Sequence, residues 1–348
     1  MSTGSRKRLL IIGTHGVPAQ YGGFETLVEN LVSQLEDFEI TVFNSSKTKG
    51  DLHRANLHLV KLPLSASGIQ GVLYDLISLT YSLFIRNTTV LYLGPTIGVG
   101  LLLPWLRRHR IVTNFGGLDE WSRPKYQGFA KLIKFNYWSA AKLSSCLIAD
   151  NCVLQRSLKE NFDEESAVIR YGGDHLNSVS FQKKNYIIVV ARAQTDSMFD
   201  LLIEAFESMP HEHLIIVSNW ESSNYGVNCK RRIAALPNID AIGPIYNKIE
   251  LTKLRLESKL YIHSHSKCGT APSLVEAISL SCPIICYDVE TNREVTKNRV
   301  KYFKSSSDLI EIIDKLNDSS LYELSLISSS LAPEFEWRNI GNQYREVL

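Results

Sequence analysis

The chain has 348 residues, of which 44% are hydrophobic and 21% are charged, and its formal net charge is +2. This length and composition are those of two α/β domains with sizeable buried cores, and so small a net charge excludes a nucleic-acid-binding protein. Six cysteines form neither a Cys-x-x-Cys pair nor the His/Cys spacing of a metal site, so we expect reduced thiols, a cytoplasmic protein and no bound metal.

The predicted elements begin with a buried strand at residues 9–12, an apolar run too short for a signal peptide. A glycine-rich loop follows, and apolar residues at helical spacing then predict a helix that extends to Leu35. The glycine spacing fits neither the Rossmann dinucleotide fingerprint nor a P-loop. Gly22 and Gly23 would let a backbone approach a ligand closely, and their amides open the helix that carries Glu25 in its first turn.

Strands and helices alternate through the rest of the first half. We predict strands at 40–43, 57–61, 90–93, 111–114, 146–149 and 167–169, with helices such as 71–85 and 129–141 between them. Repeated βα units imply a parallel, doubly wound sheet with ligands at the carboxyl ends of its strands. The segment from Leu101 to Arg110 leads from apolar residues into four basic or titratable groups. It therefore predicts either contact with an anionic membrane surface or a buried helix with a polar exit.

Polar residues and glycines from about 171 to 184 predict a linker before a second βα series. The segments of that series are predicted at 186–191, 201–208, 213–218, 239–242 and 258–263. Arg192 directly follows the first of these strands, and guanidinium groups pair well with phosphate oxygens. We interpret it as a diphosphate ligand, the alternative being a strand-end arginine paired with a carboxylate. Histidines near strand ends, such as His263 and His265, are expected to be structural.

Residues 262–289 are the most informative stretch of the chain. We predict, in order, a strand, a loop, a short helix and a second strand: up to His263, then 266–271, 272–280 and 283–287. Pro272 suits a first helical turn, and Thr270 can cap it. The free amides and the macrodipole of such a helix start favour an anion such as a diphosphate, and Glu276, one turn further on, can accept two ribose hydroxyls. The alternative is a plain helix cap, with Glu276 a solvated surface charge.

The segment Gly-Thr-His-Gly-Val-Pro-Ala-Gln-Tyr-Gly-Gly-Phe-Glu, residues 13–25, resembles the opening of a bacterial subgroup of family 4 glycosyltransferases that includes rhamnosyltransferases. Further segments resemble the subgroup in the same order along the chain: 112–125, 148–151, 171–174, 189–192 and 262–289. The resemblance implies the α/β GT-B fold, in which two doubly wound Rossmann-like domains face a central cleft. It assigns residues 1–172 to the acceptor side, 185–325 to the nucleotide sugar, and 326–348 to a C-terminal helix that packs back on the first domain.

The resemblance also implies an activity. The enzyme would transfer a hexose or 6-deoxyhexose, rhamnose above all, from a nucleotide-diphosphate sugar to a lipid-linked oligosaccharide, with retention and with neither cofactor nor metal. This reaction belongs to capsule, O-antigen or exopolysaccharide synthesis. Contact with the inner face of the plasma membrane would run through the segment from Leu101 to Arg110, and no nucleic acid is expected. The alternatives are a degenerate, non-catalytic scaffold and a nucleotide-sugar epimerase.

The expected site residues follow from the same resemblance. Donor-binding residues are Gly22, Gly23, Arg192, Cys268, Gly269, Thr270, Ser273, Leu274 and Glu276, and acceptor-side residues are His15, Tyr21, Glu25 and Asn114. The catalytic residue is left open among Glu25, Asp119 and Glu120.

The chain departs from the family pattern at three positions. Cys268 replaces the first of two paired glutamates, Ser197 replaces a lysine, and Gly116 replaces an aspartate. Either Asp119 or Glu120 takes over the missing role, or the donor sugar differs, or the activity is impaired.

Overall fold

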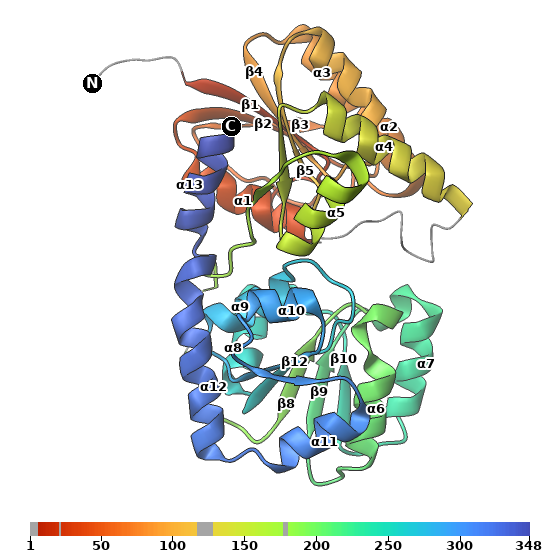
Figure 1. Cartoon of the computed structure of the whole chain (residues 1–348), viewed down its shortest axis with the longest axis vertical. Helices are drawn as coiled ribbons and strands as arrows, with labels where there is room; N and C mark the ends of the chain where they lie inside the picture. Colours follow the sequence, from red (N-terminus) through yellow and green to blue (C-terminus); the bar gives the residue numbers. More distant parts are fainter. Residues whose placement is uncertain (1–5, 21, 117–127, 177–179) are drawn as a thin grey trace. The chain divides into compact units, whose positions relative to one another are not determined.

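The computed structural model describes residues 6–20, 22–116, 128–176 and 180–348. The chain divides into two compact units. Unit 1 consists of Met1–Arg170 together with Trp337–Leu348, and unit 2 is Tyr171–Glu336. Each unit is built around one parallel β-sheet covered by helices on both faces (Figure 1).

The sheet of unit 1 has seven parallel strands in the order β3-β2-β1-β4-β5-β6-β7. The strands are β1 Lys7–Ile12, β2 Phe38–Asn44, β3 Leu57–Lys61, β4 Thr88–Leu93, β5 Arg110–Asn114, β6 Cys146–Ala149 and β7 Ala167–Val168. The central strands are largely apolar because both of their faces are buried. The chain order reverses between β1 and β4, which pair in the register Leu10 to Val90, and ligands of such folds bind at the carboxyl ends of strands at this kind of switch point.

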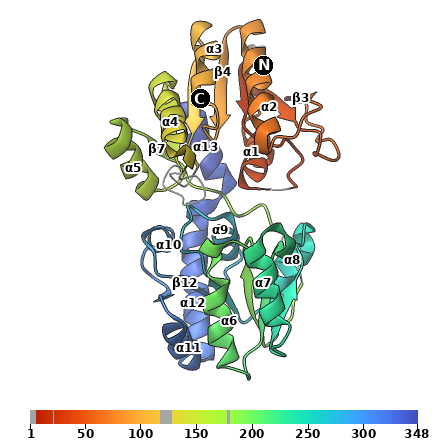
Figure 2. The same ribbon diagram turned by 90° about the vertical axis from the view of Figure 1, so that its right-hand side faces the viewer.

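The helices of unit 1 form two groups. They are α1 Gly23–Gln34, α2 Gly68–Tyr81, η1 Ser82–Phe84, η2 Gly98–Leu101, α3 Leu102–Leu106, α4 Ala130–Leu143, α5 Cys152–Phe162 and α13 Trp337–Val347. Right-handed crossovers place α1 on one face of the sheet, where α13 packs against it, and α2, α3 and α4 on the other (Figures 1 and 2). Tyr344 of α13 accepts a hydrogen bond from Asn114 at the end of β5, which ties the C-terminal helix to the sheet.

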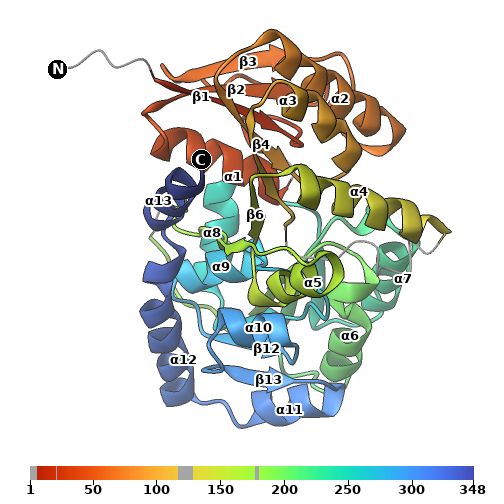
Figure 3. The ribbon, with the colours of Figure 1, turned by 45° about the horizontal axis from the view of Figure 1, so that its top comes forward.

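Unit 2 repeats the architecture with six parallel strands in the order β10-β9-β8-β11-β12-β13. The strands are β8 Ile187–Val190, β9 Leu214–Val217, β10 Ile239–Ile242, β11 Leu260–His263, β12 Ile284–Tyr287 and β13 Lys301–Phe303. The helices are η5 Thr195–Ser197, α6 Phe199–Glu207, η6 Trp220–Ser222, α7 Asn224–Ile233, α8 Lys248–Glu257, α9 Pro272–Ser279, α10 Glu290–Val295, α11 Ser306–Asp314, α12 Asp318–Leu331 and η7 Ala332–Phe335. Helix α6 packs with α7 and α11, while α9 packs with α12 on the opposite side of the sheet (Figure 3).

The expected α/β class with two doubly wound parallel sheets is confirmed. The C-terminal segment 326–348, however, does not form one helix. Helix α12 ends at Leu331, Pro333 lies in the first turn of η7, and Glu336 is extended before α13 begins at Trp337. A proline lacks the amide that would continue α12, so the chain changes direction here.

Candidate functional site

Two loops of unit 2 meet at the carboxyl ends of its neighbouring central strands β8 and β11. Ser266 donates its backbone amide to the carbonyl of Asp196 at 2.7 Å, and the Ser264 hydroxyl donates to the carbonyl of Ser197 at 2.6 Å. The strands themselves pair in parallel, Leu260 with Ile187. Because the strand order of unit 2 reverses between β8 and β11, the joined loops occupy the position where doubly wound sheets bind ligands.

Arg192 lies on the first of these loops with an exposed side chain. Among the described residues no ion pair joins it to a carboxylate, so the alternative of a strand-end arginine paired with an acid has no support. Ser197, which stands where the family has a lysine, is buried, and its hydroxyl donates to the carbonyl of Arg192 at 2.6 Å. Its hydroxyl therefore closes the loop that presents the guanidinium group.

The second loop leads into α9, which begins as predicted at Pro272. The prediction that Thr270 is the cap of this helix is wrong: Ala271 is the N-cap residue, and its side chain makes no cap hydrogen bond. Thr270 precedes the N-cap residue and is 2% exposed. Leu274 is wholly buried, so only its backbone is available to a ligand, whereas Ser273 and Gly269 are partly exposed.

Glu276 is held by two basic side chains of unit 2. Its carboxylate accepts a hydrogen bond from Arg255 Nη2 at 2.6 Å and lies 3.4 Å from His175 Nε2. Burial raises the pKa of Glu276, but the Arg255 charge and the His175 contact outweigh burial and bring it below the ordinary value. A carboxylate that is 16% exposed and paired in this way is not a solvated surface charge.

Arg255 is the most unusual charged residue of unit 2. It projects from α8, its side chain is only 1% exposed, and its Nε and Nη1 groups have no hydrogen-bond partner among the described residues. Buried guanidinium groups are normally satisfied on several nitrogens. The arrangement therefore commits Arg255 to one function in the described structure, which is to hold the Glu276 carboxylate.

The segment that carries His175 runs against α9. A Cβ atom on Gly173 would lie 2.6 Å from the carbonyl oxygen of Val275 and 2.5 Å from Ser279 Oγ. Only glycine permits this close approach, because any side chain would collide with the helix backbone. Gly173 thereby brings His175 within reach of Glu276.

Cys268 was expected to face the donor sugar, and the structure gives its thiol other neighbours. Its Sγ lies 3.2 Å from Asn292 Oδ1, 3.7 Å from Thr291 Oγ1 and 3.9 Å from His263 Nε2. The rings of His263 and His265 stack with their centroids 4.7 Å apart. Burial lowers the pKa of the His263 ring well below its usual range and that of His265 to about 4, so both rings are uncharged at neutral pH.

In unit 1 the buried side chain of Glu25 holds the glycine-rich loop at the end of β1 in place. Glu25 is buried and accepts hydrogen bonds from the His15 amide at 2.8 Å and from the Thr14 hydroxyl at 3.3 Å. A Cβ atom on Gly22 would lie 2.8 Å from the same carboxylate, so the glycine leaves room for this contact. Gly23 is the first residue of α1. Glu25 thus orders the loop that was expected to bear acceptor-side residues.

The remaining predicted residues of unit 1 fall into two classes. Asn114 is buried; its amide nitrogen donates to Tyr344 at 2.6 Å, and its oxygen accepts from the Gly116 amide at 2.7 Å. Its side chain therefore shapes the turn after β5. Tyr21, Asp119 and Glu120 lie outside the described residues.

Sequence reasoning missed Arg255 and His175. Arg255 lies in an ordinary helical pattern of α8, and nothing in its spacing distinguishes it from a solvated charge. A signal existed for His175, since it directly follows Tyr171-Gly-Gly-Asp174, one of the segments that resemble the glycosyltransferase subgroup.

Comparison with known proteins divides the chain in two. Residues 6–174 match a domain of unknown function, DUF1972, and residues 174–325 match the Glycosyl transferases group 1 family. No curated protein matches the chain.

Solved structures resemble the chain over nearly its whole length. Sucrose-phosphate synthase from Thermosynechococcus elongatus is 15% identical, with a TM-score of 0.80 and 98% of each chain covered. HepE from Anabaena, in complex with UDP and glucose, is 15% identical, with a TM-score of 0.73 and coverage of 98% of this chain and 99% of that one. An E. coli structure described as trehalose-6-phosphate bound with UDP-2-fluoro glucose is 8% identical, with a TM-score of 0.75 and coverage of 97% and 98%. At such low sequence identity the structural similarity shows the fold alone, and it confirms the expected GT-B fold.

Proposed function

We propose that the protein is a glycosyltransferase whose donor is a nucleotide-diphosphate sugar, because residues 174–325 match the Glycosyl transferases group 1 family and the chain has the GT-B fold. The sugar proposed is a hexose or 6-deoxyhexose, with rhamnose the first candidate, and the acceptor proposed is a lipid-linked oligosaccharide of a surface polysaccharide. Two of the similar structures hold UDP with glucose or a UDP-glucose analogue, which supports this class of donor.

One observation carries the proposal. At the switch point of unit 2 the exposed guanidinium of Arg192 and the uncapped start of α9 lie on loops that hydrogen bonds join, and Glu276 follows one turn into that helix. Cationic side chains and free helix amides suit a diphosphate, and a carboxylate suits the two hydroxyls of a ribose. We assign the diphosphate to Arg192 and the amides of Ser273 and its neighbours, and the ribose to Glu276.

The proposed reaction breaks the bond between the anomeric carbon and the diphosphate oxygen. The acceptor hydroxyl forms the new bond from the same face, and its proton passes to the departing diphosphate. The protein would contribute placement and neutralisation of the leaving group, for which Arg192 and the α9 amides are suited. Arg255 and His175 would keep Glu276 ionised and fixed in one orientation, so that the ribose meets a preorganised acceptor.

A scaffold protein that binds donor without transfer remains the second candidate. Cys268 favours it, because the thiol is surrounded by Asn292, Thr291 and His263 and supplies no carboxylate. In this case donor binding would persist and product would not form.

The test is a thermal-shift screen with dTDP-rhamnose, UDP-sugars and GDP-sugars, followed by a transfer assay, because a ligand of the native state raises its apparent stability. Glu276→Gln should weaken donor binding by about 1.5–3 kcal/mol, the usual contribution of a hydrogen bond to a charged group. Glu323→Gln, an exposed carboxylate of α12, is the matched control and should leave donor binding unchanged. Equal donor affinity in Glu276→Gln and in this control would contradict the ribose assignment.

A further inference from the structure

Unit 1 exposes a broad layer of large apolar side chains on α2, α3 and α4. Six of its members, each between 40% and 65% exposed, are Leu73 and Ile77 on α2, Trp105 and Leu106 on α3, and Phe135 and Trp138 on α4. We call the surface formed by these six residues the apolar face. Soluble monomers rarely expose so many neighbouring large apolar groups unless the surface binds something.

The three helices form one continuous layer. Helix α2 packs against α3, and η2, which leads into α3, packs against α4. Glycines of η2 allow close contacts with both α4 and α2: a Cβ atom on Gly98 would lie 1.7 Å from the carbonyl oxygen of Asn136 on α4, and one on Gly100 would lie 2.8 Å from Leu79 Cδ1 on α2. Figures 1 and 2 both show α2, α3 and α4 together on the same side of the sheet.

Helix α2 departs from the usual polarity of a surface helix, because it buries two polar residues beside Tyr74 and Leu79. Asp75 and Ser78 point inward and are buried, whereas Leu73, Leu76 and Ile77 are exposed. A surface helix normally buries its apolar stripe and turns its polar residues to water. Burial raises the pKa of the Asp75 carboxyl group to about 7. Helix α2 therefore buries a titratable group while its leucine and isoleucine side chains are exposed.

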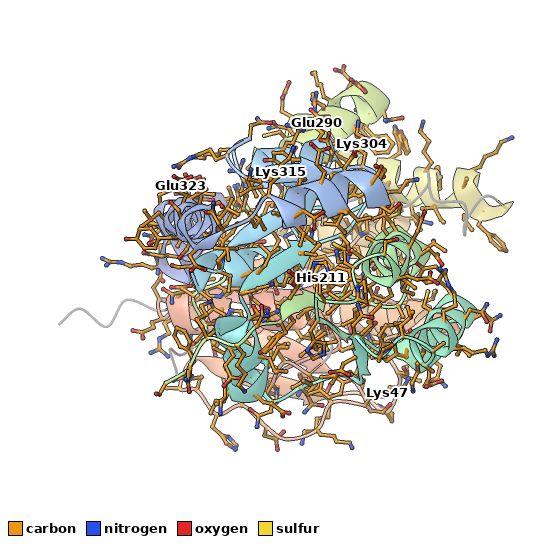
Figure 4. All side chains as sticks on the ribbon, turned by 90° about the horizontal axis from the view of Figure 1, so that it is seen from below. Lys47, His211, Glu290, Lys304, Lys315 and Glu323 are labelled. Carbon is orange, nitrogen blue, oxygen red and sulfur yellow. The ribbon has the colours of Figure 1, made fainter. Side chains whose placement is uncertain are left out.

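The exposed charges on the helices that carry the apolar face are of one sign, and the acid Glu164, outside these helices, pairs with Lys142 of α4. Residues 76–116 and 128–149, which include α3, α4 and the last six residues of α2, contain no aspartate or glutamate. Their exposed charged side chains are basic, and those nearest the apolar side chains in sequence are Arg107 and Arg108 after α3 and Lys131 and Lys134 on α4. In contrast, exposed groups of both signs, such as Glu290, Lys304, Lys315 and Glu323, lie among one another on unit 2 (Figure 4).

We propose that the apolar face and its basic rim are the surface by which the protein binds an anionic lipid bilayer. The leucine and aromatic side chains would enter the boundary between headgroups and acyl chains, and the guanidinium and ammonium groups would meet lipid phosphates. Aromatic residues such as Trp105 and Trp138 suit this boundary because they are amphipathic. No helix in the described part of the chain is long and apolar enough to cross a membrane, so the binding is to the surface.

The proposed lipid-binding surface is larger than the segment from Leu101 to Arg110 that the sequence predicted, and it leaves out two residues of that segment. The ring of His109 is buried and hydrogen-bonded to the carbonyl of Ser82 at 2.9 Å. Arg110 donates to the carbonyl of Val347 at 3.0 and 3.2 Å, so it is engaged with the C-terminus. Arg107 and Arg108 remain for lipid, and helices α2 and α4 add surface that the linear segment lacked. If the apolar face also serves to meet a lipid-linked acceptor, that role rests on the proposed function. The binding of lipid by this face does not depend on the proposed function.

The experiment is flotation of the full chain with vesicles of neutral phosphatidylcholine, with and without anionic phosphatidylglycerol, in the absence of donor. The first variant carries Trp105→Ser, Leu106→Ser and Phe135→Ser, and its control carries Tyr246→Ser and Ile249→Ser, equally exposed apolar residues of unit 2. We expect the parent and the control to float with anionic vesicles and the first variant to lose at least about tenfold in partitioning.

A second variant tests charge without touching the apolar side chains. Arg107→Gln with Lys131→Gln should lower partitioning into anionic vesicles about 30-fold, because each basic group near such a surface contributes about fivefold. Its control, Arg231→Gln with Lys248→Gln on unit 2, should float like the parent.

Three results would overturn the proposal. The parent could fail to float with anionic vesicles. The first variant could float as well as its control while both remain folded by circular dichroism. Sedimentation velocity could show a dimer that the first variant dissociates without any lipid binding, which would assign the apolar face to a second copy of the chain. Donor-induced thermal shifts, measured without lipid, separate this proposal from the proposed function: each can fail while the other holds.

Discussion

The buried pair Arg255–Glu276 allows a prediction whose size follows from its geometry. Arg255→Met removes the guanidinium and keeps much of the side-chain volume, which leaves the Glu276 carboxylate with His175 alone. Breaking a buried pair by removing one partner costs about 3–5 kcal/mol. We take the lower end, about 3 kcal/mol, because Glu276 is 16% exposed and because two nitrogens of Arg255 already lack partners among the described residues.

The direction of the Glu276 pKa shift determines how the loss of stability in Arg255→Met changes with pH. Because the folded-state pKa of Glu276 lies below its ordinary value of 4.5, the pair stabilises unit 2 above about pH 4.5. That stabilisation is lost as the pH falls through the folded pKa, where the carboxylate of the parent takes up a proton. The deficit of Arg255→Met should therefore be largest near neutral pH and shrink as the solution becomes more acidic than the ordinary value.

Calorimetric unfolding at several pH values measures both quantities. For a unit of this size about 3 kcal/mol corresponds to a midpoint lowered by roughly 6–12 °C. Arg232→Met is the matched control, because Arg232 forms an exposed pair with Asp200 at 2.5 Å, and such a pair contributes little. The double variant Arg255→Met with Glu276→Gln should regain part of the loss, since no buried charge is left unpaired. A loss no larger than that of Arg232→Met, or a deficit that does not change with pH, would refute the reasoning.

Three further changes test separate features of the molecule. Arg192→Ala should lower turnover with little change in the unfolding midpoint, because the side chain is exposed. Its control, Arg231→Ala on α7, should change neither quantity. Equal turnover in the two variants would contradict the assignment of the diphosphate to Arg192. Gly98→Ala should destabilise unit 1 by roughly 1–3 kcal/mol, because the new methyl group would lie 1.7 Å from the carbonyl oxygen of Asn136, and an unchanged midpoint would contradict that packing. Asp75→Asn should stabilise unit 1 increasingly as the pH rises from the ordinary pKa of 3.8 to the folded pKa of about 7, because burial raises the pKa of Asp75 and the stability of the parent falls between these two values; parallel pH profiles of the two proteins would oppose it.

The sequence predicted the fold well because parallel strands are buried on both faces and therefore appear as short apolar runs. Strand β9, Leu214–Val217, is apolar and buried at every position, and the predicted segment 213–218 contains it. Helix α9 begins at the predicted Pro272 because proline at the first helical position acts locally, without help from distant residues.

Contacts between side chains of different helices or loops could not be predicted in the same way. Arg255 and Glu276 lie on different helices. The sequence pointed to Glu276 as a ligand of ribose, but nothing in it paired this residue with Arg255, which looks like an ordinary charged helical residue until the fold brings α8 and α9 together. Glu25 shows the same difficulty over a shorter distance, since its place in the first turn of α1 suggested a ligand and the structure turns it back onto the His15 amide. The pattern of α2 indicated a helix, but an apolar composition cannot say which neighbour covers which side.

Cys268 decides between enzyme and scaffold, and its surroundings sharpen the outcome expected of Cys268→Glu. A glutamate there would bring its carboxylate among Asn292, Thr291 and His263, and the His263 ring is uncharged at neutral pH because burial lowers its pKa. A carboxylate without a charged partner in a buried position is costly, so we expect a lower unfolding midpoint and lower turnover than in the parent. Cys268→Ser is the matched control: its hydroxyl can still donate to Asn292, and it should retain most of both properties. Both variants would be assayed with the same donor and acceptor as the parent. Higher turnover in Cys268→Glu would mean that the chain had lost a sugar-facing carboxylate at this position, and the scaffold would then become the better account of the protein.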